Sequence, residues 1–318
     1  MNPRDRQKAW ILSGLKHLGA PIVLATVVAL LFQVEGLDWA NPVQHVETFS
    51  GKMSVTKAEM MEGRRAIPLD VELDPSRMNF LDNIGFSNAL YWVCNSEPGS
   101  GFMSAPVCST FVAVSRGSTL RSRTRPLGRT DSQAVRDGNL LAARAVLLCL
   151  LCSCKAMFWV LEQPGSSIMH LHPLFQRLMR LVTVHQLRVP MSRFGGPTKK
   201  PTLLFSSHQC IEGIQQFMVP ERLQERQMTI RYRNGAGKWA FCGGPDLKKS
   251  QAYPPQFGIA LAKTRTMYLK RNYSTAMKFL RRARHTTGDF DRRPRVNRQW
   301  TKMADLQPVI DFLSQSHK

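Results

Sequence analysis

Two short apolar runs of this chain lead into reactive side chains, within the segments APVCSTF (residues 105–111) and LEQP (residues 161–164). The first run is followed by the thiol of Cys108, and the second by the carboxylate of Glu162. Both runs have the length and composition of buried strands. Because an open α/β sheet binds its ligands at the carboxyl ends of its strands, the pattern predicts a shared site for the two side chains.

A strand, a turn and a helix are expected upstream of these segments. Residues 45–49 run into a tight turn at Gly51, and apolar side chains at helical spacing predict a helix from Ser54. The next apolar run, residues 66–69, ends at Asp70. An acid about 20 residues after a glycine turn is suited to bind ribose hydroxyls. The spacing predicts an adenosine site, and the alternative makes Asp70 a loop residue or a helix cap.

In this order the segments resemble the motifs of the S-adenosylmethionine-dependent methyltransferases, in particular the carbon-5 cytosine DNA methyltransferases. Cys108 stands where that family has Pro-Pro-Cys, and Glu162 where it has Glu-Asn-Val or Glu-Asn-Pro. The resemblance covers roughly residues 43–207. It implies S-adenosylmethionine as the cofactor, held by residues of the first two motifs: Phe49, Ser50, Gly51 and Asp70.

The chain also departs from the family's pattern. Val107 replaces the second proline of Pro-Pro-Cys, Gln163 replaces the usual asparagine, and the first motif has one glycine, Gly51. None of these changes removes a reactive atom. The sequence shows neither a target-recognition domain nor a clear match to the last motifs of the family. The resemblance therefore leaves the target open between DNA and RNA.

The resemblance implies a reaction in which Cys108 adds to carbon 6 of a pyrimidine while Glu162 holds ring nitrogen 3. Since the thiolate is the nucleophile, we expect a basic side chain or a helix N-terminus near Cys108. Three arginines, Arg116, Arg121 and Arg123, follow it closely. The alternatives are a structural role for Cys108 as a small buried hydrophobe and a surface position for Glu162 at a strand end.

Charge predicts a polyanionic partner. The formal net charge of the 318 residues is +22, and residues 221–318 alone hold 21 Lys and Arg against 7 Asp and Glu. Cations there alternate with aromatic residues, as in proteins that grip phosphates and stack on bases. The alternative is a solvated tail or a localisation signal. The candidate nucleic-acid ligands come from the loop after Cys108 and from this tail: Arg121, Arg123, Arg281, Arg282 and Arg284.

Residues 20–32 are uncharged and strongly apolar, and cations precede them. This pattern fits a signal or a membrane anchor, but we favour a buried or amphipathic N-terminal helix, because the run is shorter than the roughly 20 residues that span a bilayer. Seven cysteines do not resemble a secreted disulfide framework, which favours an intracellular location, with the nucleus among the alternatives. Cys149, Cys152 and Cys154 fit a buried helix face better than a metal site, so no metal is expected.

The sequence thus predicts an α/β protein with a doubly wound, Rossmann-like methyltransferase sheet, an N-terminal apolar helix and a basic C-terminal extension. We divide it into an apolar and basic segment (1–42), a methyltransferase-like domain (43–218) and a basic, partly disordered extension (219–318). The expected activity is methylation of a base in nucleic acid, at cytosine carbon 5. The alternative is a catalytically silent methyltransferase-like module that binds nucleic acid.

Overall fold

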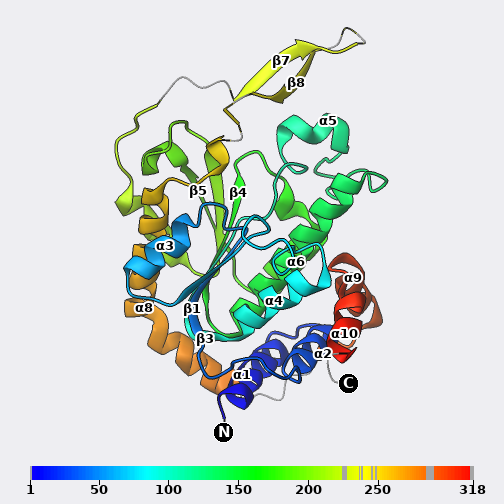
Figure 1. The fold of residues 1–318 in the computed structure, drawn as a ribbon, viewed down its shortest axis with the longest axis vertical. Coiled ribbons are helices and arrows are strands. Elements are labelled where there is room, and N and C mark those ends of the chain that lie inside the picture. Colours follow the sequence, from blue (N-terminus) through cyan, green and yellow to red (C-terminus); the bar gives the residue numbers. More distant parts are fainter. Residues whose placement is uncertain are drawn as a thin grey trace.

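The computed structural model describes residues 2–223, 228–235, 237, 239–244, 246–247, 249–283 and 290–315. Its centre is a six-stranded sheet with the strand order β2-β1-β3-β4-β6-β5 (Figure 1). The strands are β1 Val43–Thr48, β2 Ala66–Leu69, β3 Ser96–Ser104, β4 Phe158–Pro164, β5 His185–Pro190 and β6 Pro201–Ser206. The first four in spatial order are parallel, whereas β6 is antiparallel to both β4 and β5. The predicted α/β class is confirmed, with a mixed sheet flanked by helices.

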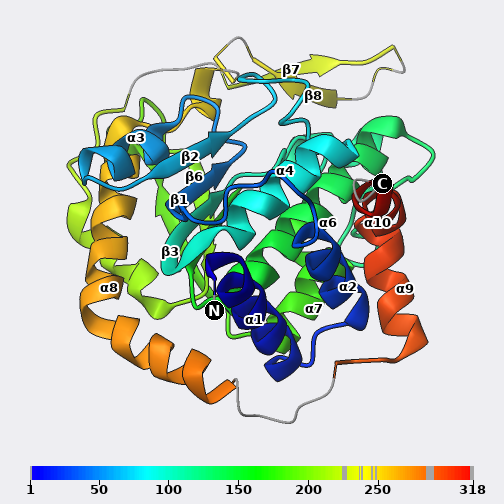
Figure 2. The same cartoon turned by 60° about the horizontal axis from the view of Figure 1, so that its bottom comes forward.

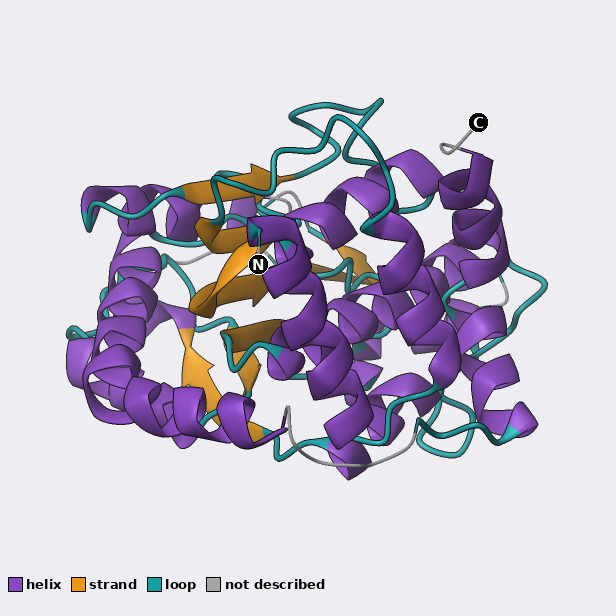
Figure 3. Cartoon of the chain, turned by 90° about the horizontal axis from the view of Figure 1, so that it is seen from below, coloured by secondary structure: helices purple, strands orange, loops and turns teal. Residues whose placement is uncertain are grey.

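Helices cover both faces of this sheet (Figure 3). The α-helices are α1 Pro3–His17, α2 Ile22–Leu31, α3 Ser54–Met61, α4 Asn83–Cys94, α5 Arg116–Thr119, α6 Gln133–Cys154, α7 Pro173–Leu181, α8 Pro255–Ala283, α9 Pro294–Met303 and α10 Leu306–Gln315. Five short 3-10 helices are η1 Ala113–Ser115, η2 Met169–Leu171, η3 Met191–Phe194, η4 Gln209–Phe217 and η5 Lys249–Gln251. A separate hairpin joins β7 Thr229–Arg233 to β8 Trp239–Gly243.

Strand β4 is apolar on both sides from Phe158 to Leu161, as is typical of a strand between two helical layers. Along β4, Phe158 and Val160 enter the cluster formed with α3, α8 and η4. Trp159 and Leu161, which point to the opposite face, enter the larger cluster formed with α4, α6 and the N- and C-terminal helices. This alternation places two hydrophobic layers around one sheet.

Strand order creates one topological switch point. From β1 the chain moves to β2 on one side and then crosses to β3 on the other side of β1. The connections that follow β1 and β3 therefore run to opposite sides. Open α/β sheets generally bind their ligands at such a point, beyond the carboxyl ends of the two strands. Because β1 to β4 are parallel, the segment 49–51, Asp70, Cys108 and Glu162 all lie toward this edge. The prediction that they share one edge is confirmed.

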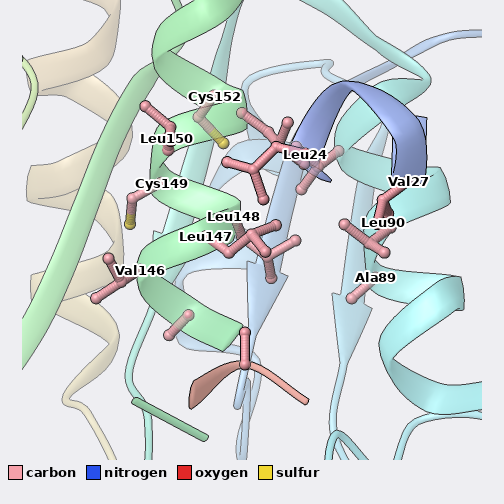
Figure 4. Close-up of a cluster of buried hydrophobic side chains, with 14 of the residues drawn as sticks. Leu24, Val27, Ala89, Leu90, Val146, Leu147, Leu148, Cys149, Leu150 and Cys152 are labelled. Carbon is pink, nitrogen blue, oxygen red and sulfur yellow. The ribbon is translucent and has the colours of Figure 1, made fainter. Parts of the chain in front are cut away.

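The apolar N-terminal run forms α2, a helix buried in the larger cluster. Figure 4 shows Leu24 and Val27 facing Leu90 of α4 and Leu148 of α6, and both α2 residues are nearly inaccessible. The backbone N–H of Val23 also donates to the Asn297 side chain of α9 at 3.3 Å. Figure 2 shows α1, α2, α9 and α10 side by side. The structure thus gives α2 the place of a core helix.

One helix of the described chain, α6, is long and apolar enough to cross a membrane. However, 78% of its most apolar 18-residue stretch is buried within the protein, because α6 lies between the sheet and the terminal helices. Cys149, Cys152 and Cys154 are part of this buried helix. Their thiols pack among leucines.

The C-terminal helices α8, α9 and α10 pack on the fold. Helix α8 lies so close to α3 that a Cβ atom on Gly258 would come within 2.1 Å of the Ser54 carbonyl oxygen. The buried guanidinium of Arg144 in α6 donates to the carbonyl oxygens of Phe80 (2.8 Å) and Ala304 (3.2 Å), and so joins α10's preceding turn to the core. These contacts join α8 and the turn before α10 to the core of the protein.

Candidate functional site

A strained turn follows β1. Phe49 and Met53 have positive φ angles of 57° and 58°, and Gly51 has 48°. Left-handed conformations of non-glycine residues are costly and cluster at functional sites. The Asp70 carboxylate holds this turn, because it accepts the Gly51 N–H at 2.8 Å and the Glu72 N–H at 2.9 Å. Asp70 therefore lies beside the turn as predicted, with part of its hydrogen-bonding capacity used within the protein.

Three buried polar atoms at this edge have no hydrogen-bond partner among the described residues. They are Ser50 Oγ after β1, Ser104 Oγ at the end of β3, and Glu162 Oε1 near the end of β4. These residues are 3%, 0% and 4% exposed. A buried polar atom without a partner costs about 1–3 kcal/mol. These three lie on neighbouring strands beside the switch point, the position at which open α/β sheets bind their ligands.

The loop carrying Cys108 is tied to β4 by the residue that replaces the family's asparagine. Gln163 donates through Nε2 to the Pro106 carbonyl oxygen at 2.8 Å, and its Oε1 accepts the Ser167 hydroxyl at 2.8 Å. The Phe111 N–H donates to the Cys108 carbonyl oxygen at 2.8 Å. These bonds bring Cys108 to the end of the strand that holds Glu162.

Electrostatics couple the two predicted catalytic side chains. Burial, together with the Glu162 charge, raises the pKa of the Cys108 thiol to about 11. Burial also raises the pKa of Glu162. Lys200, at the start of the segment leading into β6, opposes both shifts. The cation near Cys108 is thus Lys200, and none of the three arginines predicted for this role shifts its pKa.

Tyr253 completes the surroundings of Glu162. Its phenol forms a hydrogen bond with the Glu162 carboxylate, and the Lys200 Nζ lies 5.0 Å from the centroid of its ring. The Ser54 hydroxyl donates to the Tyr253 carbonyl oxygen at 2.8 Å, which fixes this segment over the start of α3. Burial and the Glu162 charge raise the pKa of Tyr253 well above its ordinary value, so the phenol stays protonated.

A further buried acid, Glu47, lies on β1 and faces this group. Its Oε2 accepts the backbone N–H and the hydroxyl of Thr56, at 2.7 and 2.6 Å. Burial raises the pKa of Glu47 to about 7. Sequence reasoning missed Glu47, Lys200 and Tyr253, because only the fold brings them to one edge.

No protein-family model matches this chain, and no curated protein matches it. Its function must therefore be argued from the side chains at this edge. A hollow of about 400 Å³ lies at the opposite edge, near the amino ends of β1 and β2. Within the described residues, no three His, Cys, Asp or Glu side chains are grouped as metal ligands.

Arg121 does not have the accessibility of a phosphate ligand. It is 2% exposed, and its guanidinium donates to the carbonyl oxygen of Pro126 (2.6 Å), the Asn139 side chain (2.8 Å) and the Thr110 hydroxyl (3.0 Å). It also covers the Phe111 ring at 3.7 Å. The proposed nucleic-acid contact of Arg121 is corrected accordingly: this arginine holds the loop after Cys108 together.

The other predicted nucleic-acid ligands differ in position. Arg123 is exposed on the same loop. Arg281 and Arg282 lie near the end of α8, but their side chains, and all of Arg284, are outside the described part of the chain. These residues remain predictions.

An exposed cationic and aromatic surface occurs instead on the β7–β8 hairpin. Arg231 covers the Trp239 ring at 3.9 Å, and Arg233 lies 5.0 Å from the same ring. Trp239 is 53% exposed and Tyr232 is 45% exposed. Figure 1 shows the hairpin above the ends of the central strands, on the side of α5. Arg231, Arg233 and Trp239 share one face of the hairpin, and we call these three residues the hairpin surface; Tyr232 points to the other face.

Proposed function

We propose that this chain is an S-adenosylmethionine-dependent methyltransferase that acts on a base in nucleic acid, at carbon 5 of cytosine. The observation that carries the proposal is the common edge of β1, β3 and β4. It combines a thiol, a carboxyl group of raised pKa and buried polar atoms without a partner, next to the switch point of the sheet.

The residues at the switch point fit an adenosine-type cofactor. Ser50 and Ser104 offer unpaired buried hydroxyls, and the backbone at Gly51 has no side chain to block a close approach. Asp70 retains carboxylate lone pairs beyond its two backbone contacts, and Phe49 flanks the turn. S-adenosylmethionine, when bound, supplies an electrophilic methyl group. Phe49, Ser50, Gly51 and Asp70 would hold it.

Cys108 and Glu162 fit the activation of a pyrimidine. After loss of its proton, Cys108 donates the sulfur electron pair to carbon 6, and the carbon 5–carbon 6 π pair becomes available at carbon 5. Glu162 needs to be protonated to donate to ring nitrogen 3, and its raised pKa favours that form. The free protein holds Cys108 as a thiol at neutral pH, so its proton must pass to solvent as the sulfur adds to carbon 6.

The net charge of +22 and the hairpin surface support a nucleic-acid substrate. Aromatic side chains stack on unpaired bases, and arginines neutralise phosphates. A base inside a duplex must leave the stack before a buried thiol can reach it. The hairpin surface lies beyond the same edge of the sheet (Figure 1), which supports a contact with the strand beside such a base.

Asp70→Asn should weaken S-adenosylmethionine binding by about 1–3 kcal/mol, because the change removes a charge-assisted hydrogen bond. Isothermal titration calorimetry on the full chain measures this directly. Glu72→Gln, which neutralises an exposed carboxylate two residues away, is the matched control and should bind as the native chain does. Unchanged affinity in Asp70→Asn would limit Asp70 to holding the turn at Gly51.

The same titration separates the two candidate functions. A silent methyltransferase-like module need not bind S-adenosylmethionine, and the engagement of Asp70 by two backbone N–H groups is the observation that favours it. Native protein that binds nucleic acid but gives no heat with S-adenosylmethionine would support this second function.

Replacing Arg231 and Arg233 together by alanine should lower the salt dependence of binding to single-stranded nucleic acid. Each phosphate contact on a single strand contributes about 0.7 to the slope of log K against log salt, so the slope should fall by about 1.4. Trp239→Ala should cost about 1–3 kcal/mol for one lost stacking contact. Fluorescence anisotropy over a salt series measures both.

The control for the hairpin variants is Arg180→Ala, an exposed arginine of α7 that lies outside the hairpin. It should reduce the slope by less than half as much as the hairpin pair does. Arg180→Ala removes one charge where the hairpin pair removes two, so a slope loss half as large as that of the pair would show that binding depends on net charge alone.

A further inference from the structure

Lys200 has a strained backbone that its surroundings hold in place. Its φ angle of 29° lies in the left-handed region, which residues other than glycine avoid. Its carbonyl oxygen accepts the Thr202 hydroxyl at 2.9 Å, and the preceding carbonyl, of Lys199, accepts the Met191 N–H at 2.8 Å. Strain of this kind persists where neighbouring contacts fix one conformation, and it gathers at functional sites.

Because of this backbone conformation, the side chains of Lys199 and Lys200 lie in different environments. The Lys199 residue is exposed, whereas Lys200 is half-buried. The Lys200 Nζ lies over the Tyr253 ring, 5.0 Å from its centroid, and donates to the Gln251 carbonyl oxygen at 3.5 Å. The ammonium is therefore held between the β6 segment and the segment before α8. The chain directly after it pairs with the carboxyl end of β4, because the Gly165 N–H donates to the Pro201 carbonyl oxygen at 2.6 Å. Gln163 binds the Pro106 carbonyl oxygen at the same strand end, so the Cys108 loop and Lys200 lie at one end of β4.

The ionisable groups that face Cys108 come from β4, from the residue before β6 and from the segment before α8. Glu162 of β4 disfavours a thiolate, and Lys200 favours it. Tyr253, before α8, faces both Cys108 and Glu162, and Glu47 of β1 acts on Tyr253 from the far side. The phenol is neutral, so Lys200 is the cation that acts on Cys108 among these described groups. Protonation of Glu162 would leave the Lys200 charge unopposed.

We propose that Lys200 is a positioning residue for Cys108: its ammonium, held over Tyr253, stabilises the thiolate through which Cys108 reacts. This inference rests on the proposed function in giving Cys108 a nucleophilic role. It does not depend on a cofactor or a nucleic acid, because the lysine acts on the thiol of the free protein. An opposite charge nearby shifts an ionisation by about 1–3 pH units.

The test is alkylation of the full native chain with iodoacetamide across a pH series. Cys108 loses its proton to solvent, and the thiolate sulfur displaces iodide from the reagent's carbon. Peptide mass spectrometry gives the rate at Cys108 relative to that at Cys242, an exposed thiol of the same chain that serves as internal reference. The ratio cancels differences in reagent and in overall reactivity.

Lys200→Met should move the pH midpoint of Cys108 alkylation upward by about one unit and slow the reaction at pH 8 roughly tenfold. Lys200→Arg should retain the native midpoint, because it retains the charge. Lys199→Met, the matched control, should have no effect. Lys200→Gln repeats the test with a polar side chain in case the methionine variant does not fold.

Overlapping pH profiles for native protein, Lys200→Met and Lys200→Gln would overturn the inference. Two further results distinguish it from the proposed function. If the pH midpoint of Cys108 alkylation shifts in the variants but the native protein binds no S-adenosylmethionine, the role of Lys200 is supported and the methyltransferase proposal is contradicted. If the native protein transfers methyl groups but the midpoint is unchanged in the Lys200 variants, the methyltransferase proposal is supported and the role of Lys200 is contradicted.

Discussion

Cys108→Ser should abolish covalent trapping of this protein by an oligonucleotide that contains 5-fluorocytosine. The native chain, with S-adenosylmethionine present, should form a complex that survives denaturing electrophoresis. Fluorine at carbon 5 cannot leave as a proton does, so the bond from the Cys108 sulfur to carbon 6 persists. A serine hydroxyl at the same position is a far weaker nucleophile than a thiolate. The expected change is from a trapped complex to none.

Cys210→Ser is the matched control, because Cys210 is also partly buried but lies in η4, on the helical layer beside α8. It should trap as the native chain does. A separate readout follows methyl transfer to an unmodified oligonucleotide. Undiminished transfer by Cys108→Ser would contradict the carbon-5 mechanism and indicate transfer to an oxygen or an exocyclic nitrogen.

Elements with strong periodic patterns could be predicted from the sequence. The helix expected to start at Ser54 is α3, and the buried helix face expected at Cys149, Cys152 and Cys154 belongs to α6. The side chain of His172 caps α7 by accepting the Leu174 N–H at 3.3 Å, a contact between residues two apart in the chain. These features depend on residues close together in the chain, where hydrophobic spacing and capping chemistry are informative.

Long-range placement could not be predicted in the same way. Strand β6 lies between β4 and β5 and is antiparallel to both. The apolar pattern of residues 201–206 predicts a strand but does not specify which strands it pairs with. It is this pairing that brings Lys200 beside Glu162. Tyr253 reaches the site only because Gly258 lets α8 pack closely on α3. Spacing along the chain contains no signal for either contact.

Arg121 shows why charge alone misassigns function. An arginine in a basic loop predicts a phosphate ligand, yet here its guanidinium is enclosed by carbonyl, amide and hydroxyl oxygens of the same loop and of α6. The sequence contains those acceptors but not their convergence. Solvent exposure distinguishes an arginine that can contact phosphate from one that holds a loop together. Arg231 and Arg233 of the hairpin are exposed, and they were not among the residues predicted from the sequence.

A buried ion-pair group fastens α8 to α3 and so supports the edge where Tyr253 lies. Glu59 of α3 is 1% exposed, and its Oε2 accepts from Arg64 and from Arg265 of α8, each at 2.7 Å. His45 of β1 lies 3.5 Å from its other oxygen. Burial alone would raise the pKa of Glu59, but His45, Arg265 and Arg64 together hold it below its ordinary value.

The pH dependence of this group follows from both shifts. A carboxylate whose folded pKa is depressed contributes stability above its unfolded pKa and loses that stability as the pH falls through the folded value. Burial lowers the pKa of His45 from 6.5 to about 4, so the unfolded chain binds that proton first as the pH falls between these values. Both terms act in one direction, so the contribution of this group to the free energy of unfolding should decline as the pH falls, through His45 from pH 6.5 toward pH 4 and through Glu59 below 4.5. The raised pKa of Glu47 acts in the opposite direction, so the decline should appear as a difference between the native chain and Glu59→Gln.

Glu59→Gln should lower the free energy of unfolding at pH 7 by about 3–5 kcal/mol, because it leaves the buried Arg265 without its counter-ion. Urea denaturation followed by circular dichroism measures the loss. Glu62→Gln is the matched control: Glu62 also faces Arg64, but at 3.8 Å and with a 37% exposed side chain, so its loss should stay below about 1 kcal/mol. Since α8 positions Tyr253, only Glu59→Gln should also reduce trapping at Cys108. Equal destabilisation by the two substitutions would show that the buried pair does not hold α8 in place.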